Sequence, residues 1–189
     1  MSDVDEPTVE KSAEQSAPED PLLQSLRDKF GEAVLATHSF RGDRTAVLDR
    51  GSLVDACSFL RDDPVNAFDM LVDVTAVDYL GRKPRFEVVY HLLSIQKNHR
   101  LRLKVPLEED DAKVASVVPV WSGANWLERE AWDLYGIQFD GHPDLKRIYL
   151  YEEFEGHPLR KDYPKEKRQP LIGPGAPVGA NADSGESRS

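Results

Sequence analysis

The stretch from residue 85 to residue 105 reads RFEVVYHLLSIQKNHRLRLKV and contains two runs in which every second side chain is apolar. The first run has an apolar residue at every second position from Phe86 to Leu92. The second run alternates basic residues with Leu101, Leu103 and Val105. A period of two places alternate side chains on opposite faces of a β-strand. These runs therefore predict two neighbouring strands with one face on a core and the other in water.

Working toward the N-terminus, the same patterning predicts three more strands, at residues 68–79, 44–49 and 34–40. The last two are separated by Arg41-Gly42-Asp43, which we expect to form the turn of a hairpin.

Three helices are expected around these strands. The first follows Asp20, a capping residue, and Pro21, which suits the first helical position. The second begins near Ser52, which together with Asp55 resembles a capping box. The third spans residues 124–135 and ends at a glycine. The order α-β-β-α-β-β-β-α predicts a two-layer α+β fold, with a mixed sheet of about five strands packed by helices.

The chain of 189 residues divides into four segments by composition. Residues 1–19 are acidic and poor in large apolar side chains, so we expect a disordered tail. Residues 20–139 hold the α+β domain. Residues 140–164 are expected to form an extended docking arm, and residues 165–189 a flexible tail rich in proline and glycine.

Charge and cysteine content exclude several classes of protein. The net charge of −10 argues against a nucleic-acid binder and against direct adhesion to anionic lipids. The single cysteine, Cys57, can form neither an internal disulfide nor the ligand set of an iron–sulfur cluster. The N-terminus lacks the pattern of a secretory or organellar targeting signal, so we expect a cytoplasmic protein.

No nucleotide-binding glycine loop, serine-nucleophile elbow or paired-histidine zinc motif occurs in the sequence. Two histidines lie in a repeated Gly-His-Pro phrase, at His142 and His157. One interpretation is a metal site, in which both imidazoles and a nearby acid such as Asp140 or Glu155 would support a stand-alone metal hydrolase. The alternative interpretation is two rigid turns, because proline restricts the residue before it to extended geometry.

The third predicted helix carries three acids and an arginine on a short stretch, residues 128–133. Paired carboxylates could act as acid and base. The alternative is a contact surface, on which Arg129 and Asp133 form an ion pair one turn apart. Trp126 and Trp132 lie beside these charges, and aromatic residues mixed with arginine are typical of protein interfaces.

The predicted arm combines bulky apolar side chains with frequent proline and glycine. Such a segment is not expected to form a core by itself, and an exposed apolar patch is a liability. We therefore expect the arm to lie across another protein, with Tyr149, Phe154 and Tyr163 as anchors.

Three stretches make the sequence recognisable. Residues 124–137 read ANWLEREAWDLYGI, residues 141–148 read GHPDLKRI and residues 155–164 read EGHPLRKDYP. Together they closely resemble the C subunit of NADH–quinone oxidoreductase, which is the thirty-kilodalton subunit of respiratory complex I. The resemblance is close over residues 124–164, and for residues 20–120 it rests on the order of the elements.

The resemblance implies a structural protein of the peripheral arm that carries no flavin, cluster or metal and has no activity when isolated. It would brace the D subunit, which helps to form the quinone site. The complex itself would hold FMN, iron–sulfur clusters and quinone, and would couple electron transfer from NADH to proton translocation. With its acidic N-terminus and no transit signal, the protein would then be a bacterial member, peripheral to the cytoplasmic side of the inner membrane and held there by its partners. The equivalent subunit of a membrane-bound hydrogenase, or of a complex that oxidises ferredoxin or deazaflavin, remains an alternative.

No catalytic, cofactor-binding or metal-binding residue is expected in this chain. The residues expected at partner interfaces are Trp126, Glu128, Arg129, Glu130, Trp132, Asp133, His142, Arg147, Tyr149, Phe154, His157, Arg160, Lys161, Asp162 and Tyr163.

Overall fold

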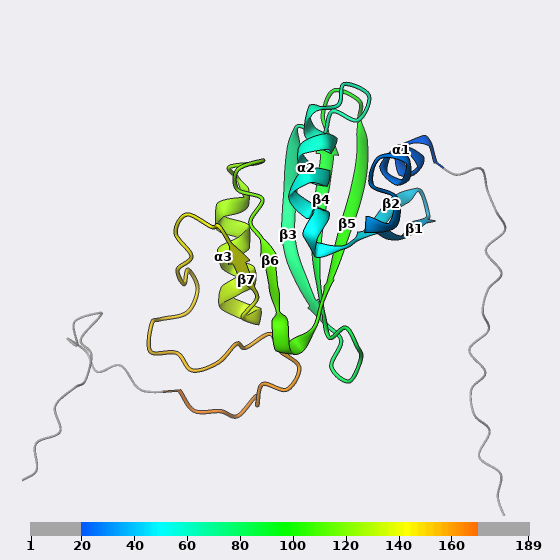
Figure 1. The fold of residues 1–189 in the computed structure, drawn as a ribbon. Helices are drawn as coiled ribbons and strands as arrows, with labels where there is room; N and C mark the ends of the chain where they lie inside the picture. The colour runs from blue at the N-terminus through cyan, green and yellow to red at the C-terminus, as the bar shows by residue number, and fades with distance from the viewer. Residues whose placement is uncertain (1–19, 170–189) are drawn as a thin grey trace, which may run out of the picture.

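A computed structural model describes residues 20–169 of the chain, and Figure 1 shows their arrangement. The α-helices in this part are α1 (Pro21–Phe30), α2 (Leu53–Asp62) and α3 (Ala124–Tyr135). Short 3-10 helices are η1 (Gly31–Ala33), η2 (Arg50–Ser52) and η3 (Glu109–Asp111). The strands are β1 (Val34–Phe40), β2 (Asp43–Leu48), β3 (Met70–Asp78), β4 (Phe86–Ser94), β5 (His99–Leu107), β6 (Lys113–Ala115) and β7 (Gln138–Asp140).

The main sheet has five strands in the order β1-β2-β5-β4-β3. Its neighbours are antiparallel except for β2 and β5, which run parallel. The predicted α+β class and mixed five-stranded sheet are therefore confirmed. The sequence did not indicate β6 and β7, which form a separate parallel pair of three residues each. Three residues are too few to show a period of two.

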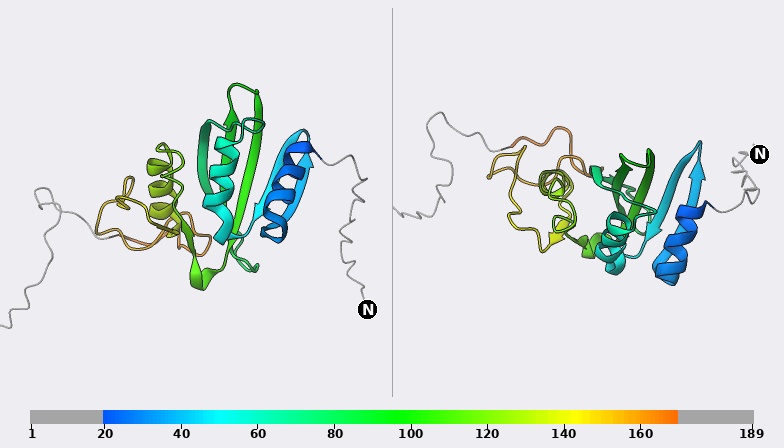
Figure 2. Two further views of the ribbon diagram at one scale, coloured as in Figure 1. Left: turned by 45° about the horizontal axis from the view of Figure 1, so that its top comes forward. Right: turned by 90° about the horizontal axis from the view of Figure 1, so that it is seen from above.

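The alternation in β4 and β5 has the predicted consequence. Register pairs such as Tyr90 with Leu103 and Leu92 with Leu101 bring apolar side chains together on one face. These four side chains are almost entirely buried. Helices α1 and α2 cover this face, as the view from above in Figure 2 shows. The opposite face carries the basic residues of β5.

Helix α1 begins as predicted, because the Asp20 carboxylate accepts a hydrogen bond of 3.0 Å from the N–H of Leu22. The predicted capping box of α2 is wrong, since the side chain of Ser52 makes no capping hydrogen bond. A 3-10 turn precedes α2 instead, and Asp49 caps that turn by accepting from the N–H of Gly51 at 2.8 Å. Ser52 is therefore already part of a helical turn when α2 begins.

Within residues 20–169, no helix is long and apolar enough to cross a membrane. Cys57 is fully buried on α2, and burial raises the pKa of its thiol far above the ordinary value. The acidic tail expected at residues 1–19 and most of the proline- and glycine-rich tail, residues 170–189, lie outside the described residues.

Candidate functional site

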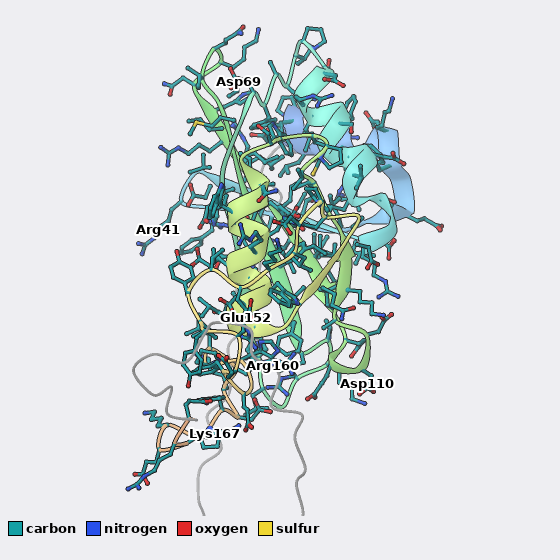
Figure 3. The ribbon with its side chains drawn as sticks, turned by 90° about the vertical axis from the view of Figure 1, so that its left-hand side faces the viewer. Arg41, Asp69, Asp110, Glu152, Arg160 and Lys167 are labelled. Carbon is teal, nitrogen blue, oxygen red and sulfur yellow. The ribbon has the colours of Figure 1, made fainter. Side chains whose placement is uncertain are left out.

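Helix α3 and the segment that follows it contain the residues predicted to act at interfaces. Figure 3 views the molecule from the side on which α3 lies in front of the sheet, with the segment passing around the helix. We call residues 140–164 the arm. It has no regular secondary structure after β7. Its position is therefore set by side-chain and backbone contacts with the rest of the chain.

Asp133 is the main contact between α3 and the arm. Its carboxylate is fully buried and accepts hydrogen bonds from the N–H groups of Ile148, Tyr149 and Leu150 at 3.0–3.1 Å. The guanidinium of Arg147 donates a further bond of 2.7 Å. Burial alone would raise the pKa of Asp133, but these donors outweigh it and hold the pKa below the ordinary value.

The end of α3 makes a second set of contacts with the arm. Carbonyls in the last turn of a helix have no partner within the helix. The carbonyl of Asp133 accepts from the ring Nδ1 of His157 at 2.9 Å, and the carbonyl of Tyr135 accepts from Arg160 at 2.6 Å. The carbonyl of Leu134 accepts from a backbone N–H of the arm at 3.1 Å. The arm thus satisfies three consecutive carbonyls.

Gly136 makes this close approach possible. Its φ of 75° lies in the left-handed region, which glycine adopts without steric cost. A Cβ at this position would come within 2.5 Å of the His157 ring and 2.7 Å of Arg160. A larger residue would therefore both strain the helix end and displace the arm.

A third contact fixes the far end of the arm to the sheet. Arg85 is almost completely buried and binds the Asp78 carboxylate through two bonds of 2.9–3.0 Å. The same guanidinium binds Asp162 at 2.8 Å and also contacts Glu109. The Asp78 carboxylate also accepts a hydrogen bond of 2.8 Å from the N–H of Lys161. The hydrogen bonds that Arg85 donates to Asp78 and then to Asp162 raise the pKa of Arg85, so the guanidinium stays charged.

The aromatic residues of the arm pack on one another. Phe154 lies edge-on to Tyr151 at 5.6 Å between ring centroids and stacks with Tyr163 at 6.1 Å. Both Phe154 and Tyr163 are half-buried as a result. The rings thus contact one another without forming a fully buried core.

The arm also differs from its expected course, because it folds onto its own domain. Asp162 and Arg160, expected at a partner interface, bind Arg85 and the carbonyl of Tyr135 in the same chain. The unpaired end of a helix and a buried arginine both need partners, and the arm supplies them. Among the three predicted anchors, Tyr149 remains largely exposed, at 63%.

Glu128 is fully buried and does not lie on a contact surface, contrary to expectation. It accepts from the Ser116 hydroxyl at 2.6 Å and from the N–H of Val117 at 2.7 Å. Burial raises its pKa from 4.5 to about 7, against the smaller lowering effect of these two donors. The buried groups that interact with its charge are Tyr90 on β4, whose hydroxyl has no hydrogen-bond partner, and Cys57 on α2.

The expected ion pair between Arg129 and Asp133 is absent. Asp133 points into the arm, and Arg129 donates instead to the carbonyls of Lys146 and Arg147 at 3.0 and 3.2 Å. The guanidinium of Arg129 also lies over the ring of Trp126, 4.8 Å from its centroid. The arginine that pairs with Asp133 is Arg147.

An exposed group of side chains remains on the outer side of α3. We call Trp126, Arg129, Glu130 and Tyr149 the contact patch. Trp126 is 64% exposed, and the Tyr149 hydroxyl donates to Glu130 at 3.2 Å. The three helical residues follow the spacing of one helix face. Trp132 is not part of this patch, because it is half-buried under Arg147.

The two histidines of the Gly-His-Pro phrases each bind backbone. The Nε2 of His142 lies 3.1 Å from the carbonyl oxygen of Asn125, and its Nδ1 accepts from the N–H of Asp144. Burial, and to a smaller extent the nearby arginines, lower the pKa of His157, although the hydrogen bond to the Asp133 carbonyl acts in the opposite direction. Within residues 20–169, no cluster of three or more His, Cys, Asp or Glu side chains could hold a metal ion.

A family model matches this chain over residues 46–169, which include the second half of β2, then β3 to β5, α2, α3 and the arm. The family is described as the 30 Kd subunit of respiratory-chain NADH dehydrogenase. The chain belongs to this family.

Relatives of this 30 kDa family cover most of the chain. An NADH-quinone oxidoreductase C subunit from Geotalea uraniireducens is 47% identical over 150 residues, which are 78% of this chain and 90% of that protein. The protein of the same name from Acidithiobacillus ferrooxidans is 52% identical over 149 residues, or 76% of this chain and 74% of that protein.

Solved structures give the same result for the fold. A trypsin-resistant fragment of Nqo5 is 32% identical, with a TM-score of 0.58, and the match covers 66% of this chain and 96% of that fragment. A chain of an archaeal membrane-bound sulfane sulfur reductase has a TM-score of 0.65 over 77% of this chain and 85% of that one. Its identity of 20% supports likeness of fold only.

Three residues of this site were missed by sequence reasoning. Asp78 and Arg85 flank the turn between β3 and β4, and Ser116 lies in the loop after β6. None belongs to a motif, and their partners are 7 to 83 residues away in the chain. The available signal was weak: an acid and an arginine at the facing ends of two paired strands.

Replacement of Asp133 by asparagine should release the arm. The variant loses the charge that pairs with Arg147 and places amide hydrogens against backbone donors. We expect the free energy of unfolding to fall by about 2–4 kcal/mol. Hydrogen exchange at residues 148–150 should accelerate. The control is Asp144→Asn, which alters an exposed arm carboxylate paired with Lys146. Unchanged exchange at residues 148–150 in Asp133→Asn would contradict the proposed anchor.

Glu128 should make stability depend on pH. A pKa raised to about 7 in the folded chain favours the protonated form. Protonated Glu128 therefore contributes its full stabilisation of the folded chain below the unfolded pKa near 4.5, and this stabilisation is lost as pH rises through 7. The full loss corresponds to about 3 kcal/mol. We expect Glu128→Gln to be less sensitive than the native chain between about pH 5 and pH 8, in urea unfolding. Glu130→Gln is the matched control, and parallel native and Glu128→Gln curves would refute the role of Glu128.

Proposed function

We propose that this chain is a structural, cofactor-free component of the peripheral arm of a proton-translocating NADH–quinone oxidoreductase. In this proposal it binds and braces the D subunit on the cytoplasmic side of a bacterial inner membrane. Its membership of the 30 kDa family supports the type of complex. Its relatives are named as the C subunit of NADH-quinone oxidoreductase, which supports the same assignment.

The contact patch is the observation that carries a docking role. Trp126 and Tyr149 are large aromatic side chains, exposed to 64% and 63%. Tryptophan, tyrosine and arginine are the residues most enriched among those that contribute strongly to protein–protein binding. Arg129 covers the Trp126 ring at 4.8 Å, and Glu130 holds the Tyr149 hydroxyl, so both aromatic rings are oriented before a partner arrives. Orientation in advance lowers the entropic cost of binding.

In this proposal the arm contributes to docking by holding Tyr149 in place within the contact patch. Tyr149 lies in the segment whose backbone N–H groups bind Asp133. The contacts at Asp133 and Arg85 hold that segment at two separated points. The patch therefore combines residues from a helix and a loop in one fixed arrangement.

The lack of a cofactor in this chain is part of the proposal. The one cysteine, Cys57, is buried, whereas a cubane or two-iron cluster needs several ligands. We expect the full chain, purified alone, to show no visible absorbance from flavin or iron–sulfur and no NADH or quinone turnover. A chromophore bound at near one per chain would contradict this.

Assembly tests the docking role. We expect the double change Trp126→Ala and Tyr149→Ala to lower retention of the chain in the complex purified from detergent-solubilised membranes by at least about tenfold, the effect of losing about 1.4 kcal/mol. The thermal unfolding of the free chain should change little, because both side chains are largely exposed. Complexes are quantified by the ratio of this chain to the co-purifying NADH-oxidising subunits.

Val65→Ala is the control, since Val65 is a large apolar residue, 72% exposed, in the loop after α2. Full retention of the double variant would reject the contact patch. Co-purification with a hydrogenase or a ferredoxin-oxidising assembly, without NADH-oxidising subunits, would reject the proposed complex and leave the patch intact.

A further inference from the structure

The face of the main sheet opposite α1 and α2 is not covered by a helix of the described residues (Figure 2). Cross-strand register places the side chains of Arg100 and Leu93 in one row on this face, and those of Thr45, Arg102 and His91 in the next. Arg100 is exposed and Arg102 half-exposed. The face therefore has a basic centre.

A hollow of about 230 Å³ lies in this region. The residues that line it are Asp43, Arg44, Val72, His91, Leu92, Arg100, Leu101 and Arg102. The register places the Arg44 side chain on the other face, with Ala46. The basic side chains on this face are Arg100, Arg102 and His91, and the apolar lining includes Val72, 46% exposed. Such a lining fits a ligand with carboxylates and small apolar groups.

The positive charge of the hollow is only partly balanced. Arg102 contacts Asp43 at 3.4 Å, and Arg44 binds Asp20 at 2.5 Å. Arg100 has no acidic partner among the described residues. His91 is affected by this imbalance: burial, and then the charge of Arg102, lower the pKa of its ring, despite acids nearby at Asp43 and Asp73. The site therefore has capacity for further carboxylates.

The acidic segment 1–19 joins the described structure at Asp20, on the helix-covered side of β2, the strand that borders this hollow. Asp20 binds Arg44, and the next residue along the edge, Asp43, lines the hollow from the open face of β2. The segment carries one lysine and six acids, at Asp3, Asp5, Glu6, Glu10, Glu14 and Glu19. A fully extended chain of this length spans roughly 60 Å, so its acids can reach the hollow from Asp20 without strain.

We propose that the N-terminal segment 1–19 binds across the basic hollow of its own chain, with its carboxylates paired to Arg100 and Arg102. Exposed ion pairs are individually weak and are screened by salt. The covalent link compensates, because it keeps the local concentration of the segment high. The segment is thus a salt-sensitive cover for a basic surface in an otherwise acidic protein. This inference does not depend on the proposed function.

Paramagnetic broadening of amide NMR signals tests the contact in the full chain. A nitroxide is attached at Ser12→Cys, and the native Cys57 is buried and does not compete for the label. We expect the amide signals of Val72, His91 and Arg102 to be broadened at low salt. The broadening should be lost at about 1 M salt, where the Debye length is about 3 Å.

Three comparisons isolate the charges. A chain with the six acids changed to Asn or Gln gives the broadening caused by the tether alone. The double change Arg100→Gln and Arg102→Gln should reduce the broadening to the level caused by the tether alone. Arg82→Gln, in the turn at the other end of β4, should leave it unchanged. Equal broadening in the native and neutralised chains overturns the proposal.

A mixed sample distinguishes the two possible sources of the segment. Nitroxide-labelled chain without isotope is mixed with isotope-enriched chain that carries no nitroxide. We expect no broadening in the enriched chain, because the segment binds its own hollow. Broadening there would show that the segment binds a second copy and would overturn the proposal as stated.

Discussion

The buried carboxylate of Asp133 is the contact on which the arrangement of α3 and the arm depends. A carboxylate without exposure to water is stable only when its oxygen atoms are fully used. The Asp133 carboxylate accepts hydrogen bonds from three successive backbone N–H groups and from Arg147. The converse also holds. Those N–H groups lie in a segment without regular structure, and a buried donor without a partner is costly.

The arm is therefore part of the domain's own hydrogen bonding. It completes the end of α3 through His157 and Arg160, and completes the Asp78–Arg85 pair through Asp162. Breaking any one of these contacts leaves a charge or a carbonyl unpaired. Because the three contacts are distributed along the arm, they hold it as a unit, and they determine where Tyr149 lies relative to Trp126.

Two acids on α3 show how position decides protonation. Glu128 and Asp133 are both fully buried. Glu128 faces the core near Tyr90 and Cys57, where it receives two hydrogen bonds and no cation, and its pKa rises to about 7. Asp133 faces the arm and receives four hydrogen bonds, one from a guanidinium, and its pKa falls. The number and charge of the donors decide the direction, since burial opposes ionisation in both cases.

The local elements were predictable from the sequence, because their causes are local. Alternation identified β4 and β5, Asp20 identified the start of α1, and the phrase at residues 124–137 identified both α3 and the family. The pairing of short strands was not predictable, since β6 and β7 have three residues each and bind one another across more than twenty residues of chain.

The sequence by itself thus determined the fold class, the order of the main elements and the resemblance in residues 124–164. The tertiary structure alone decided what the polar residues do. Spacing suggested that Arg129 pairs with Asp133 on one helix, but Asp133 binds Arg147, 14 residues away. Helical spacing gives the face on which a side chain lies, whereas its partner is chosen by which distant segment folds over that face. Burial changes the energy of a charge far more than neighbouring residues in the sequence do, so the role of each acid followed from packing.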